Sequence, residues 1–242
     1  MKILSWDVGI KNLAYIFFDH NTSDDGIQTC QIIKWDVINL LPTNPNCSHK
    51  TCKKKVVASC TYEEITYYWC DKHLCVYENI SATPKPKQSK VKNINCNNID
   101  LNQLRLTLVQ RLDETINELI KEHTIDFVLI ENQPVLKNPR MKGLADTLYT
   151  WHLIRGMNDS NNIKSINPVN ASHKLRAYKK ELDKYKGKEK YNKTKALSIE
   201  IANKFLQENN MENWENILTT HDKKDDLCDC LLQGLYWINY GN

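Results

Sequence analysis

The 242-residue chain is 41% hydrophobic and 26% charged, and its 33 Lys and Arg residues outnumber its 29 Asp and Glu residues. This composition suits one sizeable domain with a small appendage and argues against a wholly disordered chain. No apolar run approaches the roughly 20 residues of a transmembrane helix, and the chain reaches Asp7 too early for a secretory signal. We therefore expect a cytoplasmic or nuclear protein that is neither secreted nor membrane-bound. Its mild positive charge permits a nucleic-acid partner.

The first forty residues predict three strands joined by short loops. Residues 2–7 form an apolar run that ends in an acid, and a second apolar run, 13–18, follows a short turn that contains Gly9. Residues 31–37 predict a third strand. Strands joined in this way form an antiparallel meander.

Residues 41–96 interrupt this pattern. Five of the nine cysteines lie between 47 and 75, and the segment ends in a Pro- and Lys-rich stretch over 83–92, which is typical of a linker or a solvated arm. We interpret 41–96 as an insertion into a domain made of 1–40 and 97–242.

The rest of the chain alternates helix and strand. Apolar spacing predicts helices over 102–122, 141–155, 191–208 and 227–239, and short strands over 125–130 and 163–166. A strand, a helix and a further strand suit a right-handed crossover to a parallel strand.

Acids stand at the ends of several predicted buried elements. Asp7 ends the first strand, Glu131 ends the strand at 125–130, and Asp226 and Asp229 lie three residues apart at the start of the last helix. Carboxylates beside so much apolar sequence need neutralisation, which a pair of divalent cations would provide. Mg²⁺ prefers oxygen ligands, and two such ions promote attack by water on a phosphodiester. A turn or helix-cap role is the simpler explanation for any one of these aspartates.

Three motifs carry a resemblance to a known family. Residues 3–14 (ILSWDVGIKNLA), 128–134 (VLIENQP) and 223–233 (KKDDLCDCLLQ) resemble, in this order, motifs of RuvC-like Holliday junction resolvases of the poxvirus and large-DNA-virus branch. The resemblance covers roughly 1–40 and 97–242. It implies an RNase H-like mixed five-stranded sheet flanked by helices. It also implies a homodimer that nicks two strands of a four-way DNA junction symmetrically.

The resemblance also implies roles for individual residues. It makes Asp7, Glu131, Asp226 and Asp229 the ligands of two Mg²⁺ (or Mn²⁺) ions, with a shift of one residue to Asp225 left open. Lys11, Lys223 and Lys224 would neutralise phosphate near the scissile bond. In a viral setting the enzyme would act at sites of viral DNA replication.

The insertion carries a second metal pattern. The pair Cys47 and Cys52 is separated by 17 residues from the pair Cys70 and His73, which fits a tetrahedral Cys₃His structural zinc site. A metal would supply the folding energy of so small and polar a segment. Other residues that could replace one of these ligands are Cys60, Cys75 and His49.

A basic segment lies between the last predicted strand and the last two helices. Residues 174–195 contain ten Lys and Arg against three acids. Such a cluster positions nucleic acid through phosphates without reading its sequence, although each lysine alone could equally be solvated. Besides those named above, the residues predicted to contact DNA are Arg140, Lys142, Lys174, Arg176, Lys179 and Lys180.

The leading hypothesis is therefore a Mg²⁺-dependent, structure-selective endonuclease that resolves four-way junctions. One alternative keeps the fold but changes the substrate to RNA–DNA hybrids or flaps, since fold does not fix substrate. The other is a zinc-containing nucleic-acid-binding protein without catalysis.

Overall fold

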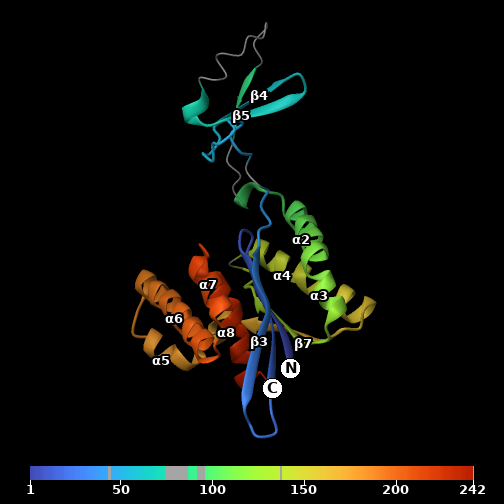
Figure 1. Cartoon of the computed structure of the whole chain (residues 1–242), viewed down its shortest axis with the longest axis vertical. Helices are drawn as coiled ribbons and strands as arrows, with labels where there is room; N and C mark the ends of the chain where they lie inside the picture. Colours follow the sequence, from blue (N-terminus) through green and yellow to red (C-terminus); the bar gives the residue numbers. More distant parts are fainter. Residues whose placement is uncertain (43–44, 75–86, 92–95, 137, 242) are drawn as a thin grey trace. The chain divides into compact units, whose positions relative to one another are not determined.

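The chain folds into two compact units. One combines 1–40 with 100–242, and the other spans 41–99. The computed structural model describes the whole chain except residues 43–44, 75–86, 92–95, 137 and 242. Each unit is described by itself (Figure 1).

A mixed sheet of five strands forms the centre of the larger unit, with the order β3-β2-β1-β7-β8. β1 is antiparallel to β2, and β2 to β3, whereas β1–β7 and β7–β8 are parallel pairs. The meander and the crossover are thus as predicted. The bounds are β1 Lys2–Asp7, β2 Leu13–Thr22, β3 Gln28–Ile38, β7 Ile125–Asn132 and β8 Ile163–Asn170.

β8 is twice as long as predicted. It continues past the predicted end at 166 through Pro168, a residue that has no N–H to donate. β8 is the edge strand of the sheet, where a proline costs few ladder hydrogen bonds.

Helices cover both faces of this sheet (Figure 1). α2, α3 and α4 lie on one face, and α6, α7 and α8 on the other. Their bounds are α2 Leu101–Thr115, α3 Asn117–Glu122, α4 Pro139–His152, α5 Lys179–Leu182, α6 Gly187–Glu208, α7 Glu212–Thr220 and α8 Lys224–Tyr240.

Several helix boundaries differ from the predictions. The predicted helix 102–122 is broken at Ile116, a buried β-branched residue. α6 and α8 each begin before the predicted start, because their first turns are polar and give no apolar signal. Asp225 and Asp226 in the first turn of α8 suit the positive end of the helix dipole.

α8 packs closely on the sheet. A Cβ atom at Gly234 would lie 2.6 Å from the Phe18 ring, so only glycine permits this approach. The Gln233 amide donates to Ser5 Oγ at 3.1 Å and to the Trp6 carbonyl at 3.2 Å. These buried contacts fix the position of α8 across β1 and β2.

On the opposite face, α4 runs into a π-helical segment, η3 (Leu153–Asp159). Within it, Gly156 is buried and its Cβ would lie 2.0 Å from Ile163 Cδ1. The η3 segment therefore rests directly on the first residue of β8.

The smaller unit contains a three-stranded antiparallel sheet that the sequence reading did not predict. Its order is β5-β4-β6, with β4 Ala58–Tyr62, β5 Ile65–Trp69 and β6 Gln88–Lys90. Val56 and Trp69 are buried with Cys47 and Cys70 in a small core of its own. Four buried residues are a modest core, which agrees with a unit that needs further stabilisation.

Among the helices that the structure describes, none has both the length and the apolar composition of a membrane span.

Candidate active site and metal centre

Two of the predicted acids are neighbours because of strand register. Trp6 of β1 pairs with Ile130 of β7, so the next residues, Asp7 and Glu131, lie side by side. Both follow buried strand residues, and both side chains are largely buried, at 13% and 15% exposed. The parallel pairing of β1 and β7 thus brings together carboxylates that are 124 residues apart in the sequence.

α8 brings the other two acids. Asp226 and Asp229 lie one turn apart in its N-terminal half, and the helix is anchored there by a hydrogen bond from Trp35 Nε1 to the Leu227 carbonyl at 3.1 Å. Asn12, in the turn after β1, donates its amide to Asp226 Oδ2 at 2.8 Å.

Three of these carboxylates converge on one ammonium group, that of Lys174. Its Nζ donates to Asp7 Oδ1 at 2.6 Å, to Glu131 Oε2 at 3.1 Å and to Asp229 Oδ2 at 3.3 Å. The chain reaches this point through a short turn, Ala171–His173, directly after β8. Buried acids require a cation, and Lys174 provides one at their centre.

The pKa values reflect this crowding. Burial favours the protonated form of Asp7, but the Lys174 ammonium and a hydrogen bond with Glu131 together outweigh it and lower the pKa of Asp7. Burial, reinforced by Asp7, raises the pKa of Glu131 to about 8. Burial also raises the pKa of Asp229, although Lys174 opposes it. Burial alone would lower the pKa of Lys174, but the carboxylates raise it. Near neutral pH the cluster therefore retains a proton that a divalent cation would displace.

The two adjacent aspartates of α8 have different surroundings. Burial, with the charges of Asp225 and Asp7, raises the pKa of Asp226 to about 6, so Asp226 belongs electrostatically to the cluster. Asp225 instead forms an ion pair with Lys195 of α6. This geometry favours Asp226 over Asp225 as the fourth acid.

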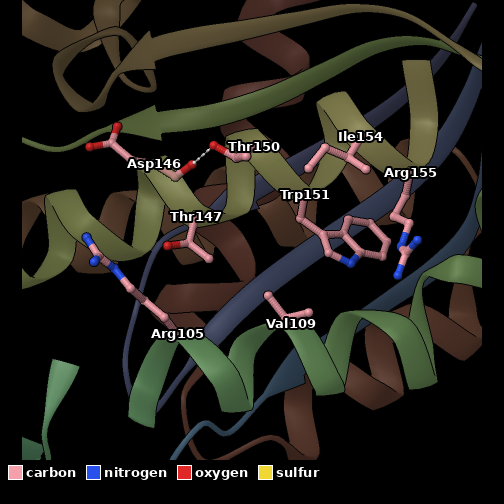
Figure 2. Close-up of a pocket in the computed structure, with 8 residues that line it drawn as sticks. All are labelled: Arg105, Val109, Asp146, Thr147, Thr150, Trp151, Ile154 and Arg155. Carbon is pink, nitrogen blue, oxygen red and sulfur yellow. Dashed lines mark hydrogen bonds between the residues drawn. The ribbon is translucent and has the colours of Figure 1, made fainter. Parts of the chain in front are cut away.

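A pocket opens beside the acids. Its volume is about 340 Å³, and its lining includes Glu131, Lys174, Asp229, Lys179 and Thr194. A second hollow, of about 440 Å³, lies between α2 and α4 and is drawn in Figure 2. Its lining contains none of the four predicted acids, so this hollow is separate from the acid cluster.

In the smaller unit, the ligand atoms of Cys47, Cys52, Cys70 and His73 all lie within 4.8 Å of one another. The Cys52 and Cys70 sulfurs are 3.7 Å apart, and His73 Nδ1 is 3.5 Å from the sulfurs of both Cys47 and Cys70. Four ligands arranged tetrahedrally about 2.3 Å from a zinc ion would have sulfurs about 3.8 Å apart. The predicted Cys₃His set is therefore brought together, with spacing that fits zinc.

Of the other candidate zinc ligands, the structure describes Cys60 and His49. Cys60 is buried in β4, and His49 stacks on the His73 ring with centroids 4.0 Å apart. Cys75 lies outside the described residues. Burial, followed by the nearby His49, lowers the pKa of His73, which keeps it in the neutral form that a metal requires.

Comparison with known proteins decides the family. A family model described as mitochondrial resolvase Ydc2 / RNA splicing MRS1 matches residues 3–135 and 43–241 in overlapping segments. The chain belongs to this family. The uncharacterized protein L451 of Acanthamoeba polyphaga mimivirus is 30% identical over 316 residues, spanning 99% of this chain and 75% of that protein.

Solved structures of this class share the fold. The yeast mitochondrial Holliday junction resolvase Ydc2 aligns with a TM-score of 0.50 at 16% identity, covering 98% of this chain and 78% of that one. A fowlpox virus resolvase in complex with Holliday junction DNA aligns with a TM-score of 0.49 at 15% identity, covering 99% and 97%. The family match, the Ydc2 alignment and the order of the five strands confirm the resemblance to the resolvases and the predicted fold class.

The predicted DNA-contacting residues of this family member fall into different environments. Lys11, Arg176, Lys179, Lys180 and Lys223 are exposed, and Lys224 and Arg140 are half-buried. Lys142 forms an ion pair with Asp146 at 2.7 Å. For all of these residues, contact with DNA stays a prediction.

Lys174 requires a correction. We predicted it on a basic surface, but its side chain is only 6% exposed and points into the carboxylates. Sequence reasoning missed this burial, because a lysine in a segment rich in lysines is expected to be solvated. One signal could have indicated the burial of Lys174. This lysine follows closely after the end of β8 in the sequence, and β8 pairs with β7, which carries Glu131. Asn12 was likewise missed as a partner of Asp226.

Proposed function

We propose that this chain is a metal-dependent endonuclease that resolves four-way DNA junctions. The observation that carries the proposal is the convergence of Asp7, Glu131 and Asp229, from three different elements, on one cationic group. Membership of a family whose description names a resolvase supports the choice of substrate.

The donor set fits Mg²⁺ or Mn²⁺. Asp7, Glu131, Asp226 and Asp229 offer only oxygen atoms, which these hard cations prefer. When bound, two such ions supply a nucleophilic water and stabilise the attacking and leaving oxygens. The products would carry 5′-phosphate and 3′-hydroxyl ends.

The protein's own groups hold and balance this centre. Strand register fixes Asp7 against Glu131, and Asn12 orients Asp226. Lys174 offsets one of four negative charges and lies at the wall of the adjacent pocket, within reach of a phosphate bound there. We propose that two copies act together to make paired, symmetric nicks, in a large-DNA-virus setting that the mimivirus relative supports.

For the smaller unit, we propose an inserted module held by a structural zinc ion on Cys47, Cys52, Cys70 and His73. With four protein ligands, such a site is closed to substrate.

The decisive experiment compares cleavage of a mobile four-way junction, an RNA–DNA hybrid, a flap and a plain duplex in Mg²⁺ or Mn²⁺. We expect paired nicks on the junction alone. Asp7→Asn and Glu131→Gln should abolish cleavage while junction binding persists.

A matched pair in α8 tests the site more finely. Asp226→Asn should abolish cleavage, whereas Asp225→Asn should retain most of it, because Asp225 is occupied by Lys195. Equal losses in both variants would contradict this arrangement of the site.

The family description also names an RNA splicing protein, which keeps the non-catalytic alternative in view. Wild-type protein that binds junctions but never nicks them in either metal would establish that alternative.

A further inference from the structure

The positive charge of the protein is concentrated in the smaller unit. Residues 41–99 contain nine lysines and four acids, whereas the rest of the chain contains 24 Lys and Arg against 25 acids. The unit therefore carries a formal charge of +5, and the catalytic unit carries −1. The net positive charge of the chain is therefore contributed by the smaller unit, whereas the four acids of the candidate site lie in the larger unit.

Four of these lysines occupy one loop beside the Cys₃His cluster. Lys50, Lys53, Lys54 and Lys55 lie within the loop 48–55, and all four are exposed. Within the described part of the chain, none of the four has an ion-pair partner.

The backbone of this loop is held at several points. Cys52 N–H donates to the His49 carbonyl at 3.0 Å, and Lys54 N–H donates to Cys52 Sγ at 3.4 Å. Ser48 N–H donates to the Tyr68 carbonyl at 2.7 Å, and Lys55 forms a β-bridge with Asn46. The loop thus presents its ammonium groups from a fixed backbone, which lowers the entropic cost of binding a partner.

The basic segment of the larger unit contrasts with this loop. There Lys174 is enclosed by the acids, Lys190 pairs with Asp183 at 2.7 Å, and Lys195 pairs with Asp225. Part of the positive charge of residues 174–195 is therefore neutralised within the protein.

We infer that the loop 48–55 is a second nucleic-acid-binding surface, which holds the phosphate backbone of a DNA arm independently of the carboxylate centre. Lysines bind phosphates as point charges and do not read sequence, which suits a partner recognised by shape. The inference rests on the proposed function only for the choice of DNA.

A competing role for these lysines is to balance the zinc centre. Three thiolates and one Zn²⁺ carry a single net negative charge, which four lysines exceed. The two roles differ in what neutralising the lysines would change: DNA affinity in one case and zinc retention in the other.

The test replaces Lys50, Lys53, Lys54 and Lys55 by Gln in the full chain. A control variant of equal charge replaces four exposed lysines of the larger unit, Lys34, Lys121, Lys164 and Lys204. Binding of a four-way junction and of a duplex is measured by fluorescence anisotropy over a series of salt concentrations without Mg²⁺. Zinc content is measured in every sample.

We expect the loop variant to keep its zinc and to bind both DNAs about 10- to 100-fold more weakly at low salt. Its plot of log Kd against log salt should be less steep by about 1 per lysine that contacts phosphate. The control variant should change far less, and a Lys→Arg version of the loop should bind like wild type. Single-turnover cleavage at saturating DNA should proceed at the wild-type rate in the loop variant.

An unchanged salt slope in the loop variant would overturn the inference, as would an equal loss in the control. Loss of zinc with retained DNA affinity would assign the lysines to the metal centre instead. Because binding is measured without Mg²⁺, a wild-type protein that never cleaves would refute the proposed function and leave this test intact.

Discussion

Replacing Lys174 by Met should make the folded protein depend on divalent cations. The substitution keeps most of the volume of the side chain but removes the ammonium group that contacts Asp7, Glu131 and Asp229. The carboxylates would then lie close together without a compensating cation. Removing only one partner of a buried ion pair is strongly destabilising, because it leaves the other charge uncompensated.

The size of the effect follows from burial. Removing one partner of a buried pair typically costs about 3–5 kcal/mol. The Asp229 side chain is 36% exposed, and Glu131 can remain protonated since its pKa is already raised to about 8. We therefore expect the low end, about 3 kcal/mol, which corresponds to a fall in Tm of about 6–12 °C for a chain of this size.

Thermal unfolding followed by tryptophan fluorescence measures this at pH 8, in buffer without Mg²⁺ and without a chelator, so that zinc is retained. Saturating Mg²⁺ should raise the Tm of Lys174→Met more than that of wild type. The deficit should shrink as the pH falls towards 5, because Glu131 and Asp226 take up protons. Lys190→Met, which removes a pair 43% and 51% exposed, should cost less than about 1 kcal/mol. A Lys174→Met protein with the wild-type Tm in the absence of Mg²⁺ would refute the reasoning.

Three further predictions concern other parts of the molecule. His152 is fully buried, and this burial lowers its pKa to about 4. As the pH falls, the unfolded chain protonates His152 before the folded chain does, so the free energy of unfolding should fall between about pH 6.5 and about pH 4. His152→Gln should remove up to about 3 kcal/mol of that fall, as measured by urea titrations at a series of pH values. Gly234→Ala should lower stability by about 1–3 kcal/mol, since the new methyl group would press on Phe18, and a gain in Tm from the better helix former would contradict this packing. Wild-type protein should contain one zinc ion per chain by elemental analysis and Cys70→Ser none, with increased exposure of Trp69 to a fluorescence quencher; a zinc content that Cys70→Ser leaves unchanged would exclude this ligand set.

The sequence predicted most of the sheet because its signals are local. Apolar runs that end in acids marked β1 and β7, and the spacing of Cys47, Cys52, Cys70 and His73 marked the cluster that the structure brings together. Asp7 and Glu131 could be placed together because parallel strands align their ends.

What the sequence could not predict depends on long-range contacts. The position of Lys174 is set by the edge strand and the turn after it, which bring a basic residue among acids distant in the sequence. The sheet of the smaller unit was missed because β4 and β6 are short and their alternation is weak. The polar first turn of α8 has no apolar periodicity, although it carries Asp226, one of the four acids of the candidate site.

The contact between Gly156 and Ile163 constrains the start of β8, at the opposite end of this strand from the carboxylate cluster. β8 begins at Ile163 and ends at Asn170, and the chain then turns to Lys174. The strand therefore connects the Gly156 contact to Lys174 rigidly. A side chain at position 156 would displace Ile163 at the start of β8, and the end of β8 leads to the ammonium group of Lys174. Substitution of this glycine should therefore disturb the centring of Lys174 among the acids from a distance of about seven strand residues, roughly 23 Å.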